Sequence, residues 1–150
     1  MNPEAAPGQP IFFCDRNLGK GFPQRLRELG LEIKAHDELF SPDTPDEEWI
    51  PQVSAQGWVI LTLDAQLRYR PVERTILRSF GARVILFTQP KQPERGWLLL
   101  LAEEFAQAQG KVTRFLEQTS APFVIRFSVD PKKRGSRRYQ LFPLKLGSDT

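Results

Sequence analysis

Short apolar runs separated by turn-forming segments divide most of the chain. Residues 11–14 (IFFC) and 58–62 (WVILT) are apolar almost without interruption, which is typical of strands buried on both faces of a parallel sheet. The run at 82–87 has the same character. Residues 31–36 and 123–129 alternate between apolar and polar positions, which predicts two further strands.

Apolar residues recur at helical spacing between these runs. The spacing predicts helices over residues 22–29, 46–56, 72–80 and 97–117. Pro51 lies inside the second of these and disfavours a regular helix there, and the last could be broken near Gly110. Strands that alternate with helices indicate an α/β fold, in which a parallel sheet has helices on both faces.

The length of 150 residues suits one domain that can bury a core without disulfides. We expect a flexible segment at residues 1–10 and the main domain at 11–120. A C-terminal extension at 121–150 follows, in which residues 139–142 pair with the strand before them as a basic hairpin.

The cysteine and histidine content restricts the chemistry. Cys14 and His36 are the single residues of their types, so the sequence contains neither an internal disulfide nor a His/Cys zinc cluster. A metal site must therefore rest mainly on oxygen ligands. No signal peptide is recognisable, and the longest apolar run, residues 97–102, is too short to span a membrane. These features predict a cytoplasmic protein without a membrane partner.

Charge is distributed unevenly around a net value of +3. Every charged residue between 131 and 145 (PKKRGSRRYQLFPLK) is basic, whereas residues 37–48 are rich in acids. This pattern fits a protein that attracts a polyanion and holds a cation. A solvated basic tail is the alternative interpretation.

Three aspartates stand where an α/β sheet places its sites. Asp15 and Asp64 follow buried strands, and Asp46 begins a predicted helix. Sites in such folds form at the carboxyl ends of the strands, so these side chains can converge. Converging carboxylates repel one another unless a hard divalent cation such as Mg²⁺ lies between them. Each aspartate taken singly could instead cap a helix or begin a turn.

The same residues carry a resemblance to a known family. The segments DRNLG (15–19), DEEW (46–49) and GWVILTLD (57–64) resemble the PIN-like domain family, and within it the branch of VapC-type toxins. The Thr62-x-Asp64 strand end is the most specific element, and the resemblance covers about residues 11–87. It implies a three-layer α/β/α fold with a mostly parallel sheet, a C-terminal helix and a β-hairpin.

The resemblance also implies roles for individual residues. Asp15, Asp46 and Asp64 would be the catalytic, metal-binding acids, and Glu47 would add a further metal ligand. Glu73 is a candidate additional acid, since the family usually has four. By analogy, Mg²⁺ or Mn²⁺ is the cofactor. Substrate contacts are assigned to five residues that lie close to the acids in the sequence: Arg16, Lys20, Thr62, Arg68 and Arg70.

The function implied is a metal-dependent endoribonuclease, the toxin of a toxin–antitoxin pair. A metal-activated water would cleave RNA, and an antitoxin protein and a second copy of the chain would be its partners. The incomplete acid set leaves open a non-catalytic PIN-like module that binds RNA or protein. A Rossmann-type nucleotide-binding domain is the third interpretation, but Gly19 and Gly21 lack the third glycine of that motif.

Overall fold

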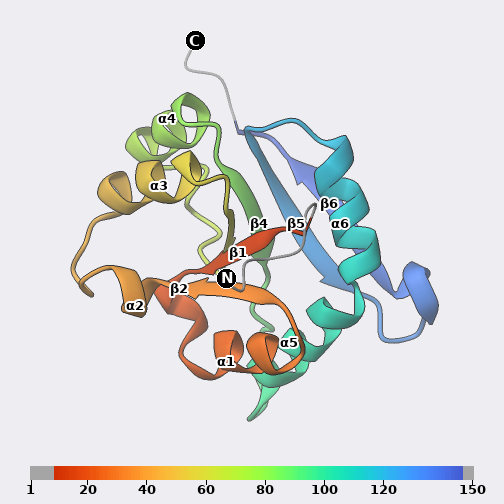
Figure 1. The fold of residues 1–150 in the computed structure, drawn as a ribbon. Helices are drawn as coiled ribbons and strands as arrows, with labels where there is room; N and C mark the ends of the chain where they lie inside the picture. The colour runs from red at the N-terminus through yellow and green to blue at the C-terminus, as the bar shows by residue number, and fades with distance from the viewer. Residues whose placement is uncertain (1–8, 147–150) are drawn as a thin grey trace, which may run out of the picture.

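The computed structural model describes residues 9–146, and its main feature is a six-stranded sheet between two layers of helices (Figure 1). The strand order is β2-β1-β3-β4-β5-β6, with the first five parallel and β6 antiparallel to β5. The strands are β1 (Ile11–Cys14), β2 (Glu32–Ala35), β3 (Val59–Thr62), β4 (Arg83–Phe87), β5 (Phe123–Val129) and β6 (Tyr139–Leu144). The predicted α/β class with a mostly parallel sheet is confirmed.

Helices connect the parallel strands. They are α1 (Gly21–Glu28), α2 (His36–Leu39), α3 (Asp46–Ala55), α4 (Pro71–Ser79), α5 (Trp97–Gln107) and α6 (Gln109–Gln118), with 3₁₀ turns η1 (Arg16–Leu18) and η2 (Gly135–Arg138). The long helix predicted over 97–117 is two helices that meet at Ala108, and Gly110 lies inside the second. Pro51 lies within α3.

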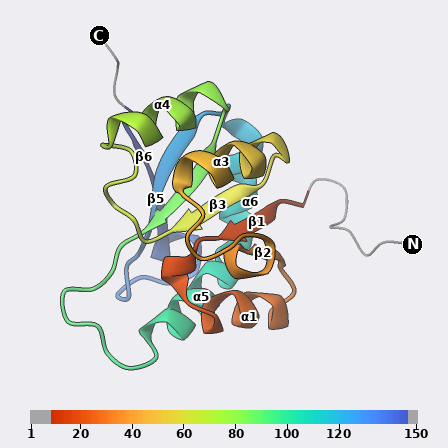
Figure 2. The same cartoon turned by 90° about the vertical axis from the view of Figure 1, so that its left-hand side faces the viewer.

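The two layers of helices cover different faces of the sheet, as Figure 2 shows, with α3 and α4 above it and α1 and α5 below. Alternate residues of each strand face the two layers. Phe12 and Cys14 pack with α1, α5 and α6, whereas Phe13 packs with α3 and α4. Burial on both faces explains why the parallel strands read as continuous apolar runs.

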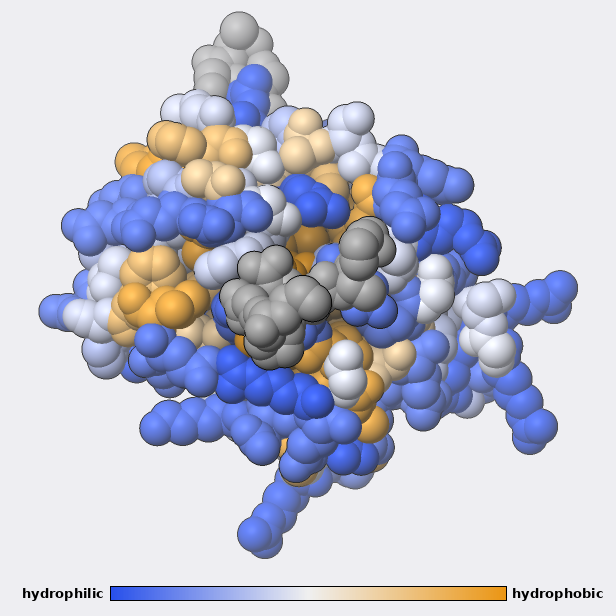
Figure 3. Space-filling model, in the orientation of Figure 1, coloured by the Kyte–Doolittle hydropathy of each residue, from blue (hydrophilic) through white to orange (hydrophobic). Residues whose placement is uncertain are grey.

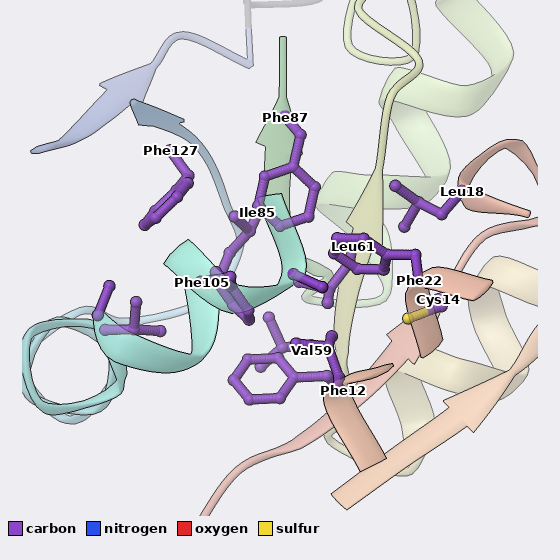
Figure 4. Packing of buried hydrophobic residues seen from close by; sticks show 14 of the residues in the cluster. Phe12, Cys14, Leu18, Phe22, Val59, Leu61, Ile85, Phe87, Phe105 and Phe127 are labelled. Carbon is purple, nitrogen blue, oxygen red and sulfur yellow. The ribbon is translucent and has the colours of Figure 1, made fainter. Parts of the chain in front are cut away.

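The larger core lies under α1, α5 and α6 (Figure 4). Phe105 of α5 is at its centre, with edge-on ring contacts to Phe12, Phe87 and Phe127 at centroid distances of 5.2, 5.2 and 5.3 Å. Such edge-to-face pairs add to the free energy gained by burial. This core holds β1, β4 and β5 to the same helix.

The C-terminal strands belong to the same sheet. β5 pairs in parallel with β4 and antiparallel with β6, and Phe123, Ile125 and Tyr139 are buried in the core. Residues 1–8 of the predicted flexible segment, and 147–150 of the predicted extension, lie outside the described residues. None of the helices in the described part is long and apolar enough to cross a membrane.

Candidate functional site

Asp15 follows the last residue of β1 and is held there by backbone and side-chain contacts. Its amide donates to the carbonyl oxygen of Leu61 at 3.0 Å, which extends the pairing of β1 with β3 by one residue. One carboxylate oxygen caps η1 by accepting from the Arg16 amide at 2.7 Å. The other accepts from the Thr62 hydroxyl at 2.9 Å. The side chain is thus fixed at the carboxyl edge of the sheet.

Thr62 connects Asp15 with Asp64. Its side chain is fully buried at the end of β3, and the hydroxyl that donates to Asp15 also accepts from the Asp64 amide at 3.1 Å. A threonine two residues before the aspartate therefore does more than continue the strand. It fixes the backbone that carries the second acid relative to the side chain of the first.

Asn17 completes this network, and the sequence analysis did not single it out. Its amide nitrogen donates to the Thr62 hydroxyl at 3.0 Å and lies 3.4 Å from an oxygen of Asp15. Its carbonyl oxygen accepts from the Leu63 amide at 3.1 Å. The available signal was an amide two residues after an aspartate at a strand end, where short polar side chains bond to nearby backbone.

Asp46 is the first residue of α3, where the helix dipole favours a negative charge. The indole nitrogen of Trp49 donates to one of its carboxylate oxygens at 3.0 Å. Trp49 is 1% exposed, so it is a core residue as well as a partner of the acid. One turn of helix places both groups at the same end of α3.

Arg70 contacts several acids that are far apart in the sequence. Its guanidinium donates to Asp64 at 2.5 Å and lies 3.4 Å from Asp46, and its Nε lies 3.4 Å from Glu73. An arginine assigned above to substrate contacts therefore forms ion pairs with these acids. Glu73 lies beside it with a side chain only 15% exposed, whereas Glu47 is exposed and has no hydrogen bond or ion pair with these acids among the described residues.

The acids influence one another electrostatically. Burial, with smaller contributions from the charges of Asp46 and Asp64, raises the pKa of Asp15 to about 6 against the lowering effect of its hydrogen bonds from Thr62 and Arg16. Burial also raises the pKa of Asp46, opposed by Trp49 and by Arg70. In both carboxyl groups burial is the largest cause of the raised pKa, and the charges of the neighbouring acids add to it.

The other predicted substrate contacts are more scattered. Arg16 binds Asp37 at 3.2 Å and the carbonyl oxygen of Pro42, so it ties η1 to the segment before α3. Arg68 donates to the carbonyl oxygen of Lys145 at 3.0 Å and stacks on Tyr69. Lys20 is exposed beside the N-terminus of α1. Of the predicted cations, Arg70 contacts the acids Asp46, Asp64 and Glu73.

The lone histidine and cysteine are core residues. His36 is 2% exposed, packs edge-on against Trp49, and burial lowers its pKa, so the ring is neutral at pH 7. Burial raises the pKa of the Cys14 thiol, which keeps it protonated. The charged side chains that contact one another at this edge of the sheet are those of Asp46, Asp64, Glu73 and Arg70.

The carboxylate oxygen atoms at this edge are of the type that binds divalent cations. Asp46 and Asp64 already share one positive group through oxygen atoms, and hard cations prefer such ligands. Within residues 9–146, however, no three carboxylate, histidine or cysteine side chains are close enough to form a ready-made metal site. For these acids to bind one metal ion together, the Arg70 guanidinium must move away from them.

Comparisons with known proteins agree on one family. The family model of the "PIN like domain" matches residues 10–89, which contain all three aspartates. A protein of Mycobacterium tuberculosis named "Putative ribonuclease VapC45" is 30% identical over 133 residues, covering 81% of this chain and 86% of that protein. No solved structure gives a significant match.

Proposed function

This chain belongs to the PIN-like domain family, and from that membership we propose that it is a metal-dependent endoribonuclease whose reaction takes place at Asp15, Asp46 and Asp64. The relative carries a ribonuclease name, and its similarity extends over most of both chains. Fold and name together support RNA as the substrate class, while the proposal for the site rests on the residues themselves.

One observation carries the proposal. Three carboxylates that are 18 to 49 residues apart in the sequence lie at one edge of the sheet, linked through Thr62 and Arg70. Burial of the Asp15 carboxylate, together with the nearby charges of Asp46 and Asp64, makes its charged form unfavourable, as the raised pKa of Asp15 reflects. Functional sites commonly have such perturbed groups, since chemistry requires them there.

Asp46 and Asp64, with Asp15 beside them, are the residues that would hold Mg²⁺ or Mn²⁺, and Glu73 is the acid available to complete the set. When bound, a divalent cation supplies a concentrated positive charge that favours ionisation of water and offsets charge on a phosphodiester. Glu47, the ligand suggested by the sequence, is less suited because it is exposed away from these contacts.

The chain's own residues have orienting roles. Thr62 and Asn17 hold the Asp15 carboxylate in one position through hydrogen bonds of 2.9 and 3.4 Å. Preorganised groups of this kind lose little entropy when substrate binds. Arg70, once displaced from the acids, is a cation within reach of a substrate phosphate.

The family resemblance also supports a protein partner. In the proposed toxin role, an antitoxin protein would bind this chain and block its acidic site. Association of two copies, expected from the same resemblance, stays a prediction.

Cleavage of single-stranded RNA by the wild type and by Asp64→Asn tests the proposal. We expect Mg²⁺- or Mn²⁺-dependent cleavage by the wild type and a loss of about a hundredfold or more in the variant. Asp43→Asn is the matched control, because Asp43 is an exposed loop residue. Equal cleavage by Asp64→Asn and the wild type would reject the assigned site.

A second candidate is a PIN-like module that binds RNA or protein without cleaving it. The close ion pairs of Arg70 with the acids favour it, because an arginine that stays in place would exclude a metal. RNA binding by the wild type without any metal-dependent cleavage would select this alternative.

A further inference from the structure

A basic hollow lies between α6 and the connection from β5 to β6, away from the aspartates. It is lined by Lys111, Lys133, Arg134 and Arg137 together with Gln140, and its volume is about 670 Å³. No carboxylate is among its lining residues. Figure 3 shows hydrophilic side chains projecting over α6 and this connection on the right-hand side of the molecule. We call this feature the basic hollow.

Within residues 9–146, most of the positive charge in the basic hollow has no close carboxylate partner. Arg134 and Arg137 are exposed and make no ion pair with a carboxylate in the described part of the chain. Lys133 has one distant contact, 3.9 Å from Asp130, between exposed groups. Lys111 donates to two neutral carbonyl oxygens, of Ser136 at 3.0 Å and of Tyr139 at 2.6 Å. A cluster of like charges is unfavourable without an anion.

The framework that presents these charges is ordered, which argues against a solvated tail. Arg138 pairs with Glu104 of α5 at 2.7 Å and donates to the carbonyl oxygens of Pro131 and Lys133. The Tyr139 hydroxyl donates to Gln107 at 3.0 Å. These bonds fix the connection to the helix layer, so that Arg134 and Arg137 project from a defined surface.

Topology connects the basic hollow with the acids. β5 is parallel to β4 and β3, so its connection to β6 begins at the same edge of the sheet as Asp64. With about 4.8 Å between strands, β5 lies about 10 Å from β3, and it continues for three residues beyond Arg126, which is level with Thr62. Exposed Lys91 and Arg95 lie in the intervening connection after β4, which extends from the left-hand side of the sheet in Figure 2.

We propose that the basic hollow binds the phosphate backbone of single-stranded RNA at nucleotides outside the cleaved bond. This inference rests on the proposed function and extends it to a second contact with the same substrate. Lysines and arginines without carboxylate partners bind phosphates, and the bound RNA releases counterions. A segment of one RNA would then reach the acids along the edge that carries Lys91 and Arg95.

Filter binding of a 20-nucleotide single-stranded RNA, in EDTA and at several salt concentrations, tests this proposal. EDTA prevents metal-dependent cleavage, so the assay reports binding alone. The variant Arg134→Gln/Arg137→Gln removes two exposed charges without touching the bonds that hold the connection. We expect about tenfold weaker binding near 0.1 M salt and a salt slope smaller by about 1.4, since each lost phosphate contact contributes about 0.7.

The control variant is Arg27→Gln/Arg78→Gln, which changes net charge equally. These arginines lie in the last turns of α1 and α4, and thermal unfolding should first verify that both variants fold. Equal RNA affinity of the basic-hollow variant and the wild type would overturn the proposal, and so would an equal loss in the control. Either result would leave the ribonuclease proposal standing if Mg²⁺-dependent cleavage persists. Conversely, absent cleavage with the expected loss of affinity would reject catalysis and retain the basic hollow.

Discussion

Arg70 lies between acids that were expected from the sequence to hold a divalent metal ion. Its nearness to Asp64 in sequence suggested a phosphate contact, yet in the structure its guanidinium lies against Asp64 and Asp46. A sequence gives the charge of a side chain but not which of several neighbouring acids it meets. The energetic result is competition, since the arginine and a divalent cation need the same oxygen atoms.

Replacing Arg70 should therefore strengthen metal binding. For Arg70→Met we expect Mn²⁺ affinity, measured by isothermal titration calorimetry, to rise about fivefold, which corresponds to about 1 kcal/mol for the lost ion pairs. Arg68→Met is the matched control, because Arg68 bonds to the Lys145 carbonyl oxygen instead of to these acids. An unchanged Mn²⁺ affinity in Arg70→Met would show that the arginine does not compete.

Asp15 makes stability depend on pH. Its pKa is raised to about 6 in the folded protein, so between about pH 4 and pH 6 the folded state binds more protons than the unfolded state. The free energy of unfolding, measured in EDTA, should accordingly fall as pH rises through this range. Asp15→Asn should remove that fall and stabilise the protein at pH 7.5 by about 1 kcal/mol, or about 3 °C in melting temperature.

The comparison of wild type and Asp15→Asn needs urea unfolding at pH 4, 5, 6 and 7.5. If the variant keeps the full decrease of stability with pH, that decrease belongs to other groups.

Asp15 and Thr62 were both identified from the sequence because strand ends are visible in it, whereas Asn17 was missed because short amides leave no periodic pattern.

Helices and strands were predictable where burial is continuous. The bounds of β1 and β5 match the prediction, since in both strands the apolar residues extend over the buried positions. The break between α5 and α6 was expected near Gly110 and falls at Ala108, which is 2% exposed, while Gly110 itself lies inside α6. Glycine lowers helix stability by about 1 kcal/mol but does not by itself end a helix. The four residues of α2 are too few for periodicity to reveal.

The helix α5 offers a sharp test of packing. Phe105→Ala should lower the free energy of unfolding by about 3–5 kcal/mol, because it leaves a cavity between three aromatic rings. Leu100→Ala in the same helix should change it by less than about 0.5 kcal/mol, since Leu100 is 63% exposed. Urea unfolding of both variants measures the difference, and similar losses would contradict the assigned core.

The whole molecule departs from the regular pattern in one connection. β1 to β2 and β3 to β4 step in opposite directions along the sheet, and α1 and α4 accordingly lie on opposite faces. The chain moves from β4 to β5 in the same direction along the sheet as from β3 to β4. However, α5 and α6 cover the face of the sheet that α1 covers, and not the face of α4. This connection therefore has the opposite hand to the others, which is rare in such sheets.

Periodicity in the sequence could not reveal that arrangement. It indicates that a segment is helical and which side is apolar, but not which face of the sheet the helix covers. The contacts that decide it join distant segments, such as the pair of Arg25 with Glu103 at 3.0 Å and the rings around Phe105. The fold class was predictable from local patterns, and the path of residues 88–122 was not.

The bond between Trp49 and Asp46 has a practical consequence. Emission from an indole is sensitive to charges close to the ring, and the buried Trp49 donates directly to the Asp46 carboxylate. The protein thus contains its own optical probe at the edge of the sheet. Replacing Trp58 and Trp97 by phenylalanine would isolate this emission, so that ligands reaching the acids can be followed in unlabelled protein.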